Sequence, residues 1–317
     1  MAIGDPTRRY AIIGTGALGG YYGARLAHAG IEVHFLAHRD AAHIREHGLK
    51  VESPDGDFSI DRPNVHEDPA MLPAVDVAVI ALKSTQNHLL PSLLSPALGE
   101  QTVVLVLQNG LEVERAAAAV AGDDRILGGL CFLCSNKVGP GHIRHLDYGR
   151  IALGEYDPQR CARGVTERMR TIAADFERAG IAIELSQDLY LARWKKLAWN
   201  IPFNGLSVLL DATTDRLMAE PATEQLARLL MEEVAAGAAA CGRTFNAGFI
   251  DKLLHDTAKM KAYRTSMKID YDEGRPMEIE SIFAQPLRAA AEAGIELPRI
   301  DTLLRQLRFL DHPGGGA

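Results

Sequence analysis

The chain has 317 residues, of which 47% are hydrophobic and 24% are charged, and this composition predicts about two domains with well-packed cores. The formal net charge of −7 argues against nucleic acid as the main partner, because a nucleic-acid backbone selects a basic face. No apolar run reaches the ~18 residues that span a membrane. Four cysteines and the lack of a signal-peptide pattern predict a cytoplasmic protein.

The first half of the chain alternates apolar strands with helices. Strands are expected at residues 10–13, 32–37, 75–82, 102–107, 126–133 and 181–185. Helices are expected at residues 17–29, 40–47, 86–98 and 166–179, although Pro91 and Pro96 weaken the third. Such alternation is typical of the α/β class, with a doubly wound and mostly parallel sheet.

The second half shows only helical patterns. They cover residues 188–210, 220–241, 249–260, 281–293 and 298–310. We therefore predict a Rossmann domain at residues 1–187 and an all-α domain at residues 188–317. The Gly-rich end, residues 313–317, is predicted to be disordered.

A glycine motif follows the first strand and opens the first helix. It consists of Gly14-Thr15-Gly16-Ala17-Leu18-Gly19. Gly14 permits a tight turn, Gly16 lets the backbone approach a pyrophosphate, and Gly19 lets the helix pack closely on the strand. The helix N-terminus then offers free N–H groups to the phosphates. The alternative is a glycine turn without a ligand, but the strand–turn–helix context favours a dinucleotide site.

The end of the second strand indicates which dinucleotide binds. An NAD enzyme places Asp or Glu there for the ribose hydroxyls, whereas this chain has His38, Arg39 and Asp40. A guanidinium at this corner favours the 2′-phosphate of NADP. Asp40 is the complication, since it is either a ribose ligand or a helix cap. We expect NADP.

Two polar residues follow the next predicted strands. Lys83 comes after the strand at 75–82, and Asn109 comes after the strand at 102–107. Both lie at the carboxyl edge of a parallel sheet, where ligands of such folds bind. Lys83 can attract an anion and Asn109 can hydrogen-bond nicotinamide or substrate. Either residue alone is more often an ordinary solvated loop residue, whereas the two together are equally compatible with a site and with such a loop.

A polar stripe lies on the first helix of the second half. Lys196, Asn200 and Asn204 are spaced i, i+4 and i+8, so they share one helix face, whereas Lys195 points elsewhere. An amine and two carboxamides in an apolar segment indicate a site in which the lysine acts as a general acid. A solvent-facing polar stripe is the alternative. Pro202 is expected to kink this helix.

Cys131 and Cys134 have the CxxC spacing, but they lie in an apolar run without a second ligand pair. We interpret them as small core residues and expect no metal site.

These dispersed motifs together resemble the ketopantoate reductase (2-dehydropantoate 2-reductase) family over nearly the whole chain. The resemblance rests on the glycine motif, on Leu82-Lys83, on Gln108-Asn109-Gly110, on the Lys196 stripe, on Ser266-Met267-Lys268-Ile269-Asp270 and on Gly274-Arg275-Pro276-Met277-Glu278-Ile279-Glu280. The family implies a Rossmann domain, a helical domain like that of 6-phosphogluconate dehydrogenase, and an active site in the cleft between them. It implies a homodimer and the reduction of a 2-oxo acid by NADPH in pantothenate biosynthesis.

The resemblance also implies roles for individual residues. Lys196 is the general acid that protonates the carbonyl oxygen. Glu278 binds the substrate hydroxyl and helps to set the protonation of the lysine. The substrate is held by Asn200, Asn204 and Ser266, and the cofactor side is lined by Lys83 and Asn109.

One departure concerns the cofactor, because the family commonly has Arg where this chain has His38, with Arg39 next. Three functions stay open at this point. They are ketopantoate reductase itself, a related 2-hydroxy-acid dehydrogenase with another 2-oxo acid, and an NADP-binding sensor without catalysis. Lys196 and Glu278 argue against the sensor, because a sensor needs no proton donor.

Overall fold

The computed structural model of the protein describes residues 8–311, which form two compact units. The first unit comprises the chain up to Gln108 together with Val113–Leu189, and the second comprises Asn109–Glu112 and the chain from Tyr190 onward. The predicted disorder at 313–317 lies outside the described residues. Within the described part, no helix is both long and apolar enough to cross a membrane.

The first unit is built on a sheet with six adjacent parallel strands. Their spatial order is β5, β2, β1, β6, β7, β8. Their bounds are β1 Arg9–Ile13, β2 Glu32–Leu36, β5 Asn64–His66, β6 Val75–Ile80, β7 Leu98–Val106 and β8 Ile126–Gly139. The chain builds outward from β1 to β5, then returns and builds in the other direction from β6. The switch in strand order therefore lies between β1 and β6, where ligands of such sheets bind.

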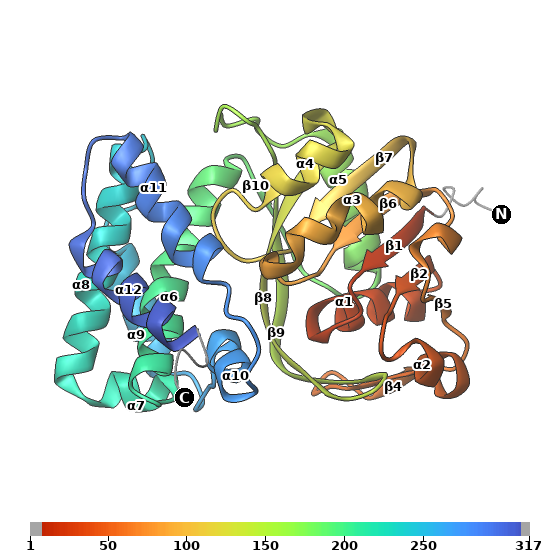
Figure 1. The fold of residues 1–317 in the computed structure, drawn as a ribbon, viewed down its shortest axis with the longest axis horizontal. Helices are drawn as coiled ribbons and strands as arrows, with labels where there is room; N and C mark the ends of the chain where they lie inside the picture. The colour runs from red at the N-terminus through yellow and green to blue at the C-terminus, as the bar shows by residue number, and fades with distance from the viewer. Residues whose placement is uncertain (1–7, 312–317) are drawn as a thin grey trace, which may run out of the picture. The chain divides into compact units, whose positions relative to one another are not determined.

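A long hairpin extends the sheet beyond its parallel part. β8 pairs antiparallel with β9, His142–Glu155, and the two run side by side as a curved ribbon (Figure 1). The remaining strands all lie beyond β8: β3 Leu49–Glu52, β4 Phe58–Ile60 and β10 Ile183–Ser186. The sequence predicted β8 only as far as Leu133 and missed β3, β4, β5 and β9. Because β4 and β9 pair antiparallel, the sheet is less purely parallel than a simple alternation suggests.

Both faces of the sheet are covered by helices because the strands are apolar on both sides. Along β1, Tyr10 and Ile12 face the core formed with α1, Ala17–His28, and α5, Glu167–Arg178. Ala11 and Ile13 face the opposite core, formed with α3, Leu90–Leu94, and α4, Glu114–Ala121.

The helix expected at 86–98 is wrong. A 3-10 helix over Ser84–Leu89, the five-residue α3 and a second 3-10 turn over Ser95–Ala97 occupy that segment. Pro91 and Pro96 each lie in the first turn of an element. Proline is tolerated there but cannot donate within a continuous helix, so the segment breaks into short pieces.

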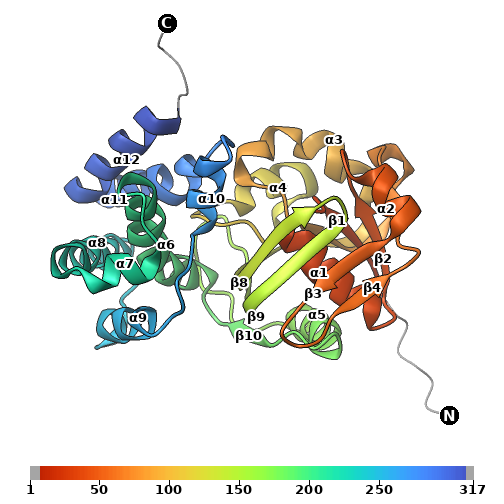
Figure 2. The same ribbon diagram turned by 90° about the horizontal axis from the view of Figure 1, so that it is seen from below.

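The second unit consists of helices around a core contributed by α6, α8, α11 and α12 (Figure 2). The bounds are α6 Leu189–Leu209, α7 Thr214–Ala219, α8 Pro221–Ala240, α9 Phe249–Ala258, α10 Ser266–Asp272, α11 Gln285–Glu292 and α12 Pro298–Asp311. A π-helical turn over Glu280–Ala284 precedes α11. The sequence missed the short helices α7 and α10, which offer too few residues for a periodic pattern.

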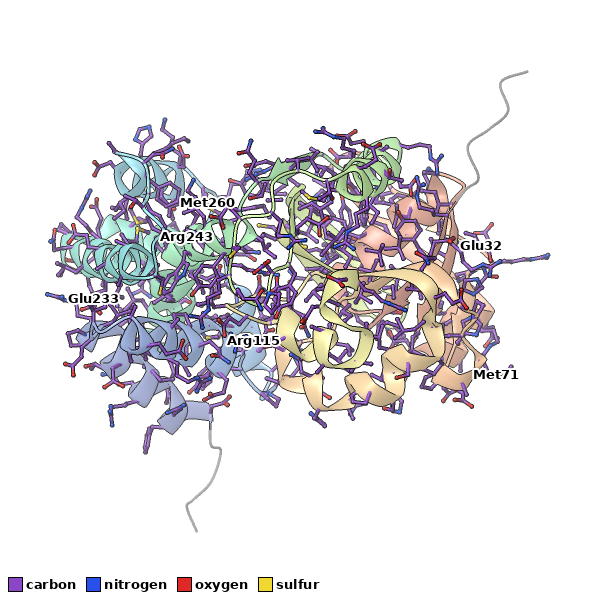
Figure 3. The ribbon with its side chains drawn as sticks, turned by 90° about the horizontal axis from the view of Figure 1, so that it is seen from above. Glu32, Met71, Arg115, Glu233, Arg243 and Met260 are labelled. Atoms are coloured by element: carbon purple, nitrogen blue, oxygen red, sulfur yellow. The ribbon has the colours of Figure 1, made fainter. Side chains whose placement is uncertain are left out.

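Helix ends in the second unit are tied together by buried side chains. Glu233 of α8, labelled in Figure 3, accepts hydrogen bonds from the backbone N–H groups of Arg299 and Ile300 at 3.0 Å, so it caps α12 from a neighbouring helix. The free N–H groups of a helix start favour a carboxylate. This capping fixes α12 against α8 and so rigidifies the framework that carries α6.

Candidate active site

The glycine loop after β1 has the conformation that a tight turn demands. Gly14 has φ +103°, and a Cβ there would lie 2.8 Å from a methyl group of Leu82. At Gly19 a Cβ would lie 2.2 Å from the carbonyl oxygen of Gly14. Both positions therefore exclude side chains, the first by conformation and the second by the close packing of α1 on the loop.

Gly16 differs from its two neighbours in the motif. A Cβ at Gly16 would meet nothing within 4 Å, and Gly16 is the N-cap residue of α1. The backbone thus borders open space at the end of a helix whose free N–H groups favour anions. A pyrophosphate group fits this cradle. Thr15 holds the loop to the neighbouring strand end, since its hydroxyl donates to the carbonyl of Leu36 at 3.0 Å.

The loops after β6 and β7 are joined beside the glycine loop. Gln108 donates from Nε2 to the carbonyl of Leu82 at 3.1 Å and to Oδ1 of Asn87 at 2.6 Å. Leu82 in turn contacts Gly14, so the chain just before Lys83 lies against the motif. Lys83 is half-buried at the start of the 3-10 helix. Gln108 was not predicted as a structural link, because a single glutamine carries no pattern.

At the corner after β2, His38 and Arg39 are exposed, whereas Asp40 is buried. Asp40 occupies the N-cap position of α2, Ala41–His47, but its carboxylate makes no capping hydrogen bond. It accepts instead from the backbone N–H of Gly141 at 3.2 Å and forms an ion pair with Lys137. The capping interpretation of Asp40 is therefore wrong, and its carboxylate is turned toward the β8–β9 hairpin.

The polar stripe of α6 runs into the interior of the helical unit. Lys196 is half-buried, and Asn200 and Asn204 are 5% and 2% exposed. Oδ1 of Asn204 has no hydrogen-bond partner among the described residues. A buried amide oxygen without a partner is costly in a resting protein, which is an argument for a ligand group at that position.

Lys195 lies elsewhere, with its ammonium nitrogen 5.8 Å from the centre of the Phe249 ring of α9. Pro202 is accommodated within α6, which is continuous from Leu189 to Leu209.

Ser266 begins α10 next to the end of the α6 stripe. Its neighbour Thr265 accepts a hydrogen bond from the backbone N–H of Lys268 at 3.2 Å and so caps α10. The Thr265 hydroxyl also bonds the hydroxyl of Ser207 at 2.8 Å, and Ser207 donates to the carbonyl of Asn204 at 3.1 Å. Thr265 and Ser207 are fully buried. These bonds bring the start of α10 to the stripe across 58 residues of sequence.

Lys268 anchors α10 a second time. Burial alone would lower the pKa of its ammonium group, but hydrogen bonds to Asp211 and Asp272 outweigh burial and raise that pKa. The distance from Nζ to the Asp211 carboxylate is 2.7 Å. Lys268 therefore stays charged and holds α10 to the turn that follows α6.

Glu278 and Asn109 approach the same turn of the helical unit. Glu278 is 4% exposed, and its carbonyl accepts from the hydroxyl of Ser281 at 3.4 Å. Next to Asn109, Gly110 has φ +114°, and a Cβ there would lie 2.5 Å from that of Ser281. The backbone N–H of Leu111 donates to the carbonyl of Ser281 at 2.9 Å. The loop at 109–112 is therefore pressed onto the π-helical turn that follows Glu278.

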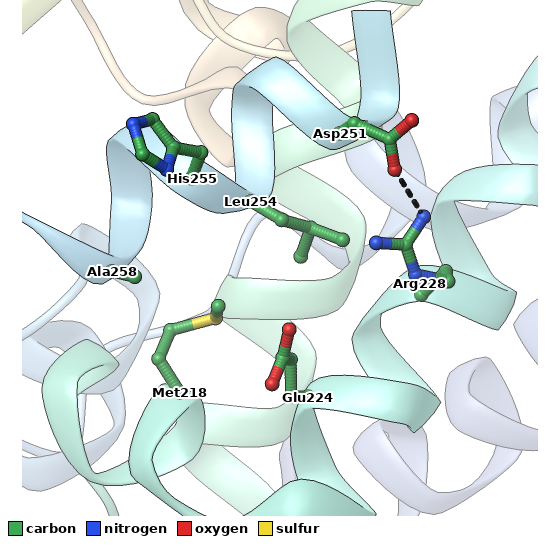
Figure 4. Close-up of a pocket in the computed structure, with 7 residues that line it drawn as sticks. All are labelled: Met218, Glu224, Arg228, Asp251, Leu254, His255 and Ala258. Carbon is green, nitrogen blue, oxygen red and sulfur yellow. Dashed lines mark hydrogen bonds and ion pairs between the residues drawn. The ribbon is translucent and has the colours of Figure 1, made fainter. Parts of the chain in front are cut away.

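A separate pocket of about 290 Å³ lies among α7, α8 and α9 (Figure 4). Arg228 and Asp251 form a 2.6 Å ion pair at its edge, and Glu224 points into it. It is lined by Met218, Glu224, Arg228, Asp251, Leu254, His255 and Ala258. None of the residues predicted from the sequence belongs to it, so this pocket is not the candidate active site.

Cys131 and Cys134 are both buried in β8, as small core residues are. Residues 8–311 contain no group of three or more His, Cys, Asp or Glu side chains placed to hold a metal ion.

Two family models match the chain. One, described as ketopantoate reductase PanE/ApbA, matches residues 10–158, and the other, described as ketopantoate reductase PanE/ApbA C terminal, matches residues 188–311. A 2-dehydropantoate 2-reductase of Nostoc sp. is 57% identical over 304 residues, covering 96% of this chain and 95% of the relative. One of Mesorhizobium japonicum is 30% identical, covering 95% and 97%.

Solved structures with the same fold include a 2-dehydropantoate 2-reductase from Geobacter metallireducens. It is 42% identical with a TM-score of 0.91, covering 95% of this chain and 99% of that one. D-mandelate dehydrogenase, solved with NADH and anilino(oxo)acetate, shares the fold at 20% identity with a TM-score of 0.86, covering 96% and 98%.

Proposed function

The chain belongs to the ketopantoate reductase PanE/ApbA family, and on that basis we propose that it is an NADP-dependent oxidoreductase that reduces 2-dehydropantoate (ketopantoate) to pantoate. The observation that carries the proposal is the 57% identity to a 2-dehydropantoate 2-reductase over nearly the full length of both chains. The reaction is a step of pantothenate biosynthesis. The half-buried Lys196 beside two buried asparagines supplies the polar groups that the chemistry needs.

The nucleotide is assigned mainly to residues of the first unit. The Gly16 cradle takes the pyrophosphate, the exposed His38 and Arg39 take the 2′-phosphate, and Lys83 and Asn109 line the nicotinamide side. When bound, the reduced nicotinamide supplies the hydride. The remaining motif residues, Thr15, Ala17 and Leu18, shape the loop and the first turn of α1.

The proton is assigned to Lys196. An oxyanion develops on the substrate carbonyl during reduction, and an ammonium group stabilises that charge before it transfers a proton to the oxygen. Asn200, Asn204 and Ser266 hold the substrate carboxylate and hydroxyl. For Asn204 the orphan Oδ1 is a ready acceptor for a hydroxyl group, and satisfying it removes the cost of leaving it unbonded.

Glu278 is assigned to the substrate hydroxyl and to the protonation of Lys196. It is buried, and a buried carboxylate stabilises a nearby ammonium far more than an exposed one does. Lys196 and Glu278 are the two residues that we expect to be catalytic.

The test is NADPH consumption by the purified protein with a panel of 2-oxo acids that includes ketopantoate and phenylglyoxylate, with NADH as the cofactor control. We expect ketopantoate to be reduced fastest, with a clear preference for NADPH. Faster reduction of another 2-oxo acid would retain the chemistry but replace the substrate. Nucleotide binding without any turnover would favour a sensor.

We also propose a cytoplasmic homodimer. A ketopantoate reductase from Staphylococcus aureus that shares the fold at 22% identity is described as dimeric. Light scattering after size-exclusion chromatography should give a mass near twice the 34.4 kDa of one chain. A mass equal to that of one chain at micromolar concentration would contradict the dimer, and cell fractionation tests the location.

A further inference from the structure

We propose that Lys137 determines the preference for NADPH by neutralising the carboxylate of Asp40. The inference rests on the proposed function, since it concerns the corner that takes the 2′-phosphate. It goes beyond that function in assigning the preference to a residue on a distant hairpin that does not belong to the nucleotide motif. Lys137 acts here as a specificity-determining residue through Asp40.

Asp40 poses a problem for a phosphate site. It follows His38 and Arg39 directly, so its backbone lies within about 7 Å of His38, the span of two residues. A carboxylate at this corner is what NAD enzymes use to bind the ribose hydroxyls, and it repels a 2′-phosphate. An uncompensated Asp40 would therefore favour the wrong nucleotide.

The hairpin removes this problem by holding the carboxylate through two contacts. The Asp40 side chain is 10% exposed, and the same oxygen, Oδ2, accepts from the backbone N–H of Gly141 and pairs with the ammonium of Lys137. A carboxylate held this way is turned away from the solvent. Together with the Lys137 ammonium it forms a pair whose net charge is zero. His38 and Arg39 stay exposed and keep their donors for an anion.

The fold places Lys137 independently of the ion pair. Lys137 lies near the end of β8 and pairs in register with Ile143 of β9. Ile143 packs against Gly20 of α1, where a Cβ would lie 2.8 Å from it, and Ser135 donates to the carbonyl of Ala17 at 3.4 Å. The hairpin thus rests on the first turns of α1, next to the glycine loop.

The expected effect follows from the charges. Removing the ammonium leaves a mostly buried negative charge at the corner to which the 2′-phosphate is assigned, in a region of intermediate dielectric. We expect binding of a 2′-phosphorylated nucleotide to weaken about tenfold, while binding of a nucleotide without this phosphate stays the same.

The experiment is isothermal titration of the full chain with 2′,5′-ADP and with 5′-AMP, which needs no turnover. Lys137→Met should weaken binding of 2′,5′-ADP about tenfold and leave 5′-AMP unchanged. Adding Asp40→Asn to Lys137→Met should restore 2′,5′-ADP binding to within about threefold, because the repelling charge is gone. Lys137→Arg should bind like the wild type.

Lys50→Met is the matched control, because Lys50 pairs with Glu52 at 3.1 Å on the neighbouring strand β3 and should affect neither nucleotide. If Lys137→Met bound 2′,5′-ADP with wild-type affinity, this inference would be overturned but the proposed function would stand. Failure of Asp40→Asn to restore binding would overturn the neutralisation, since Lys137 would then act on the phosphate itself. Wild-type protein that binds neither nucleotide would overturn the proposed function and this inference together.

Discussion

At the scale of single residues, adjacent side chains of the same type have different surroundings. Lys195 and Lys196 are neighbours on α6, but Lys195 lies over the ring of Phe249, whereas Lys196 lies on the face that carries Asn200 and Asn204. The 100° step of the helix alone separates the two lysines. Lys195 can therefore serve as a control for the chemistry assigned to Lys196.

Lys196→Ala should lower kcat at least 100-fold, the usual contribution of a positioned general acid, while NADPH affinity changes less than about twofold. Lys195→Ala should keep near-wild-type kcat. Steady-state kinetics with ketopantoate and fluorescence titration with NADPH provide the two measurements. Normal turnover by Lys196→Ala would show that the proton comes from another group.

Candidate site residues could be selected from the sequence only where their spacing carried a pattern. The i, i+4, i+8 stripe and the glycine motif were visible because helical geometry and the strand–turn–helix context fix their meaning. The link between Ser207 and Thr265 spans 58 residues, and the pair of Asp40 and Lys137 joins the start of α2 to β8, far apart in the chain. No local pattern reports such pairs, because tertiary contact alone creates them.

At the scale of elements, α1 packs against the sheet through glycines as well as through large side chains such as Tyr22 and Leu26. Gly19 lies against the loop itself, and a Cβ at Gly23 would lie 2.5 Å from the ring of Phe35. Such close approach brings the helix start to the strand ends, where we propose that the phosphates bind. Of the three motif glycines, only Gly16 borders open space. Gly14 and Gly19 are therefore needed for packing, whereas Gly16 is available for the proposed phosphate contact.

Gly19→Ala should lower the free energy of unfolding by about 2 kcal/mol or more, because the added methyl group overlaps backbone that cannot move freely. Gly16→Val should lower it by less than about 1 kcal/mol yet block NADPH binding, because its side chain fills the open cradle. Urea unfolding and nucleotide titration of both variants test this contrast. Equal destabilisation by the two substitutions would contradict it.

Thr265→Val should destabilise the protein by about 1–3 kcal/mol, since it removes a helix cap and leaves the buried Ser207 hydroxyl without this bond. If Ser266 binds substrate, KM for ketopantoate should rise as well. Thr302→Val is the control, because Thr302 is exposed and bonds only within α12. A loss no greater than that of the control would show that the link contributes little.

The elements themselves were largely predictable. Strands β1, β2, β6 and β7 and helices α1, α5, α6 and α8 lie within a few residues of their expected bounds. The β8–β9 hairpin was missed because the second strand, with residues such as Arg144, His145 and Asp147, is polar and half-exposed in its first part. Only pairing with β8 and β3 makes it a strand.

At the scale of the whole molecule, charged groups limit stability at both ends of the pH range. Hydrogen bonds from Arg144 and Lys50 lower the pKa of Glu52 from 4.5 to about 2. Burial would raise the pKa of Asp272, but hydrogen bonds from Lys268 and Arg264 outweigh it and lower that pKa. Burial and a hydrogen bond to Asp175 raise the pKa of Tyr10 well above its usual range.

The carboxyls of lowered pKa stabilise the fold fully above about pH 4.5, and that contribution disappears as pH falls toward 2. Tyr10 contributes to the pH dependence with the opposite sign. Its pKa is raised in the folded state, so its contribution to stability is present below pH 10 and is lost as the pH rises above 10, where the tyrosine of the unfolded chain ionises. The urea midpoint, followed by circular dichroism, should therefore fall on both sides. A urea midpoint that does not change between pH 5 and pH 3 would contradict the predicted loss of stability in acid. Tyr10→Phe should reduce the fall of the midpoint at alkaline pH.

The loop at 109–112 makes the two units inseparable by a single cut of the gene. Leu111 is fully buried among the helices of the second unit. The 77 residues that follow the loop, Val113–Leu189, belong to the first unit, and the second unit resumes only at Tyr190. A fragment starting at residue 190 would carry a cavity of leucine size, a defect of about 2–5 kcal/mol, and the carbonyl of Ser281 would lose its donor. When first units are exchanged between relatives, residues 109–112 must therefore come from the same parent as the helical unit. Each recombinant then needs two more junctions than a protein whose two domains simply follow one another.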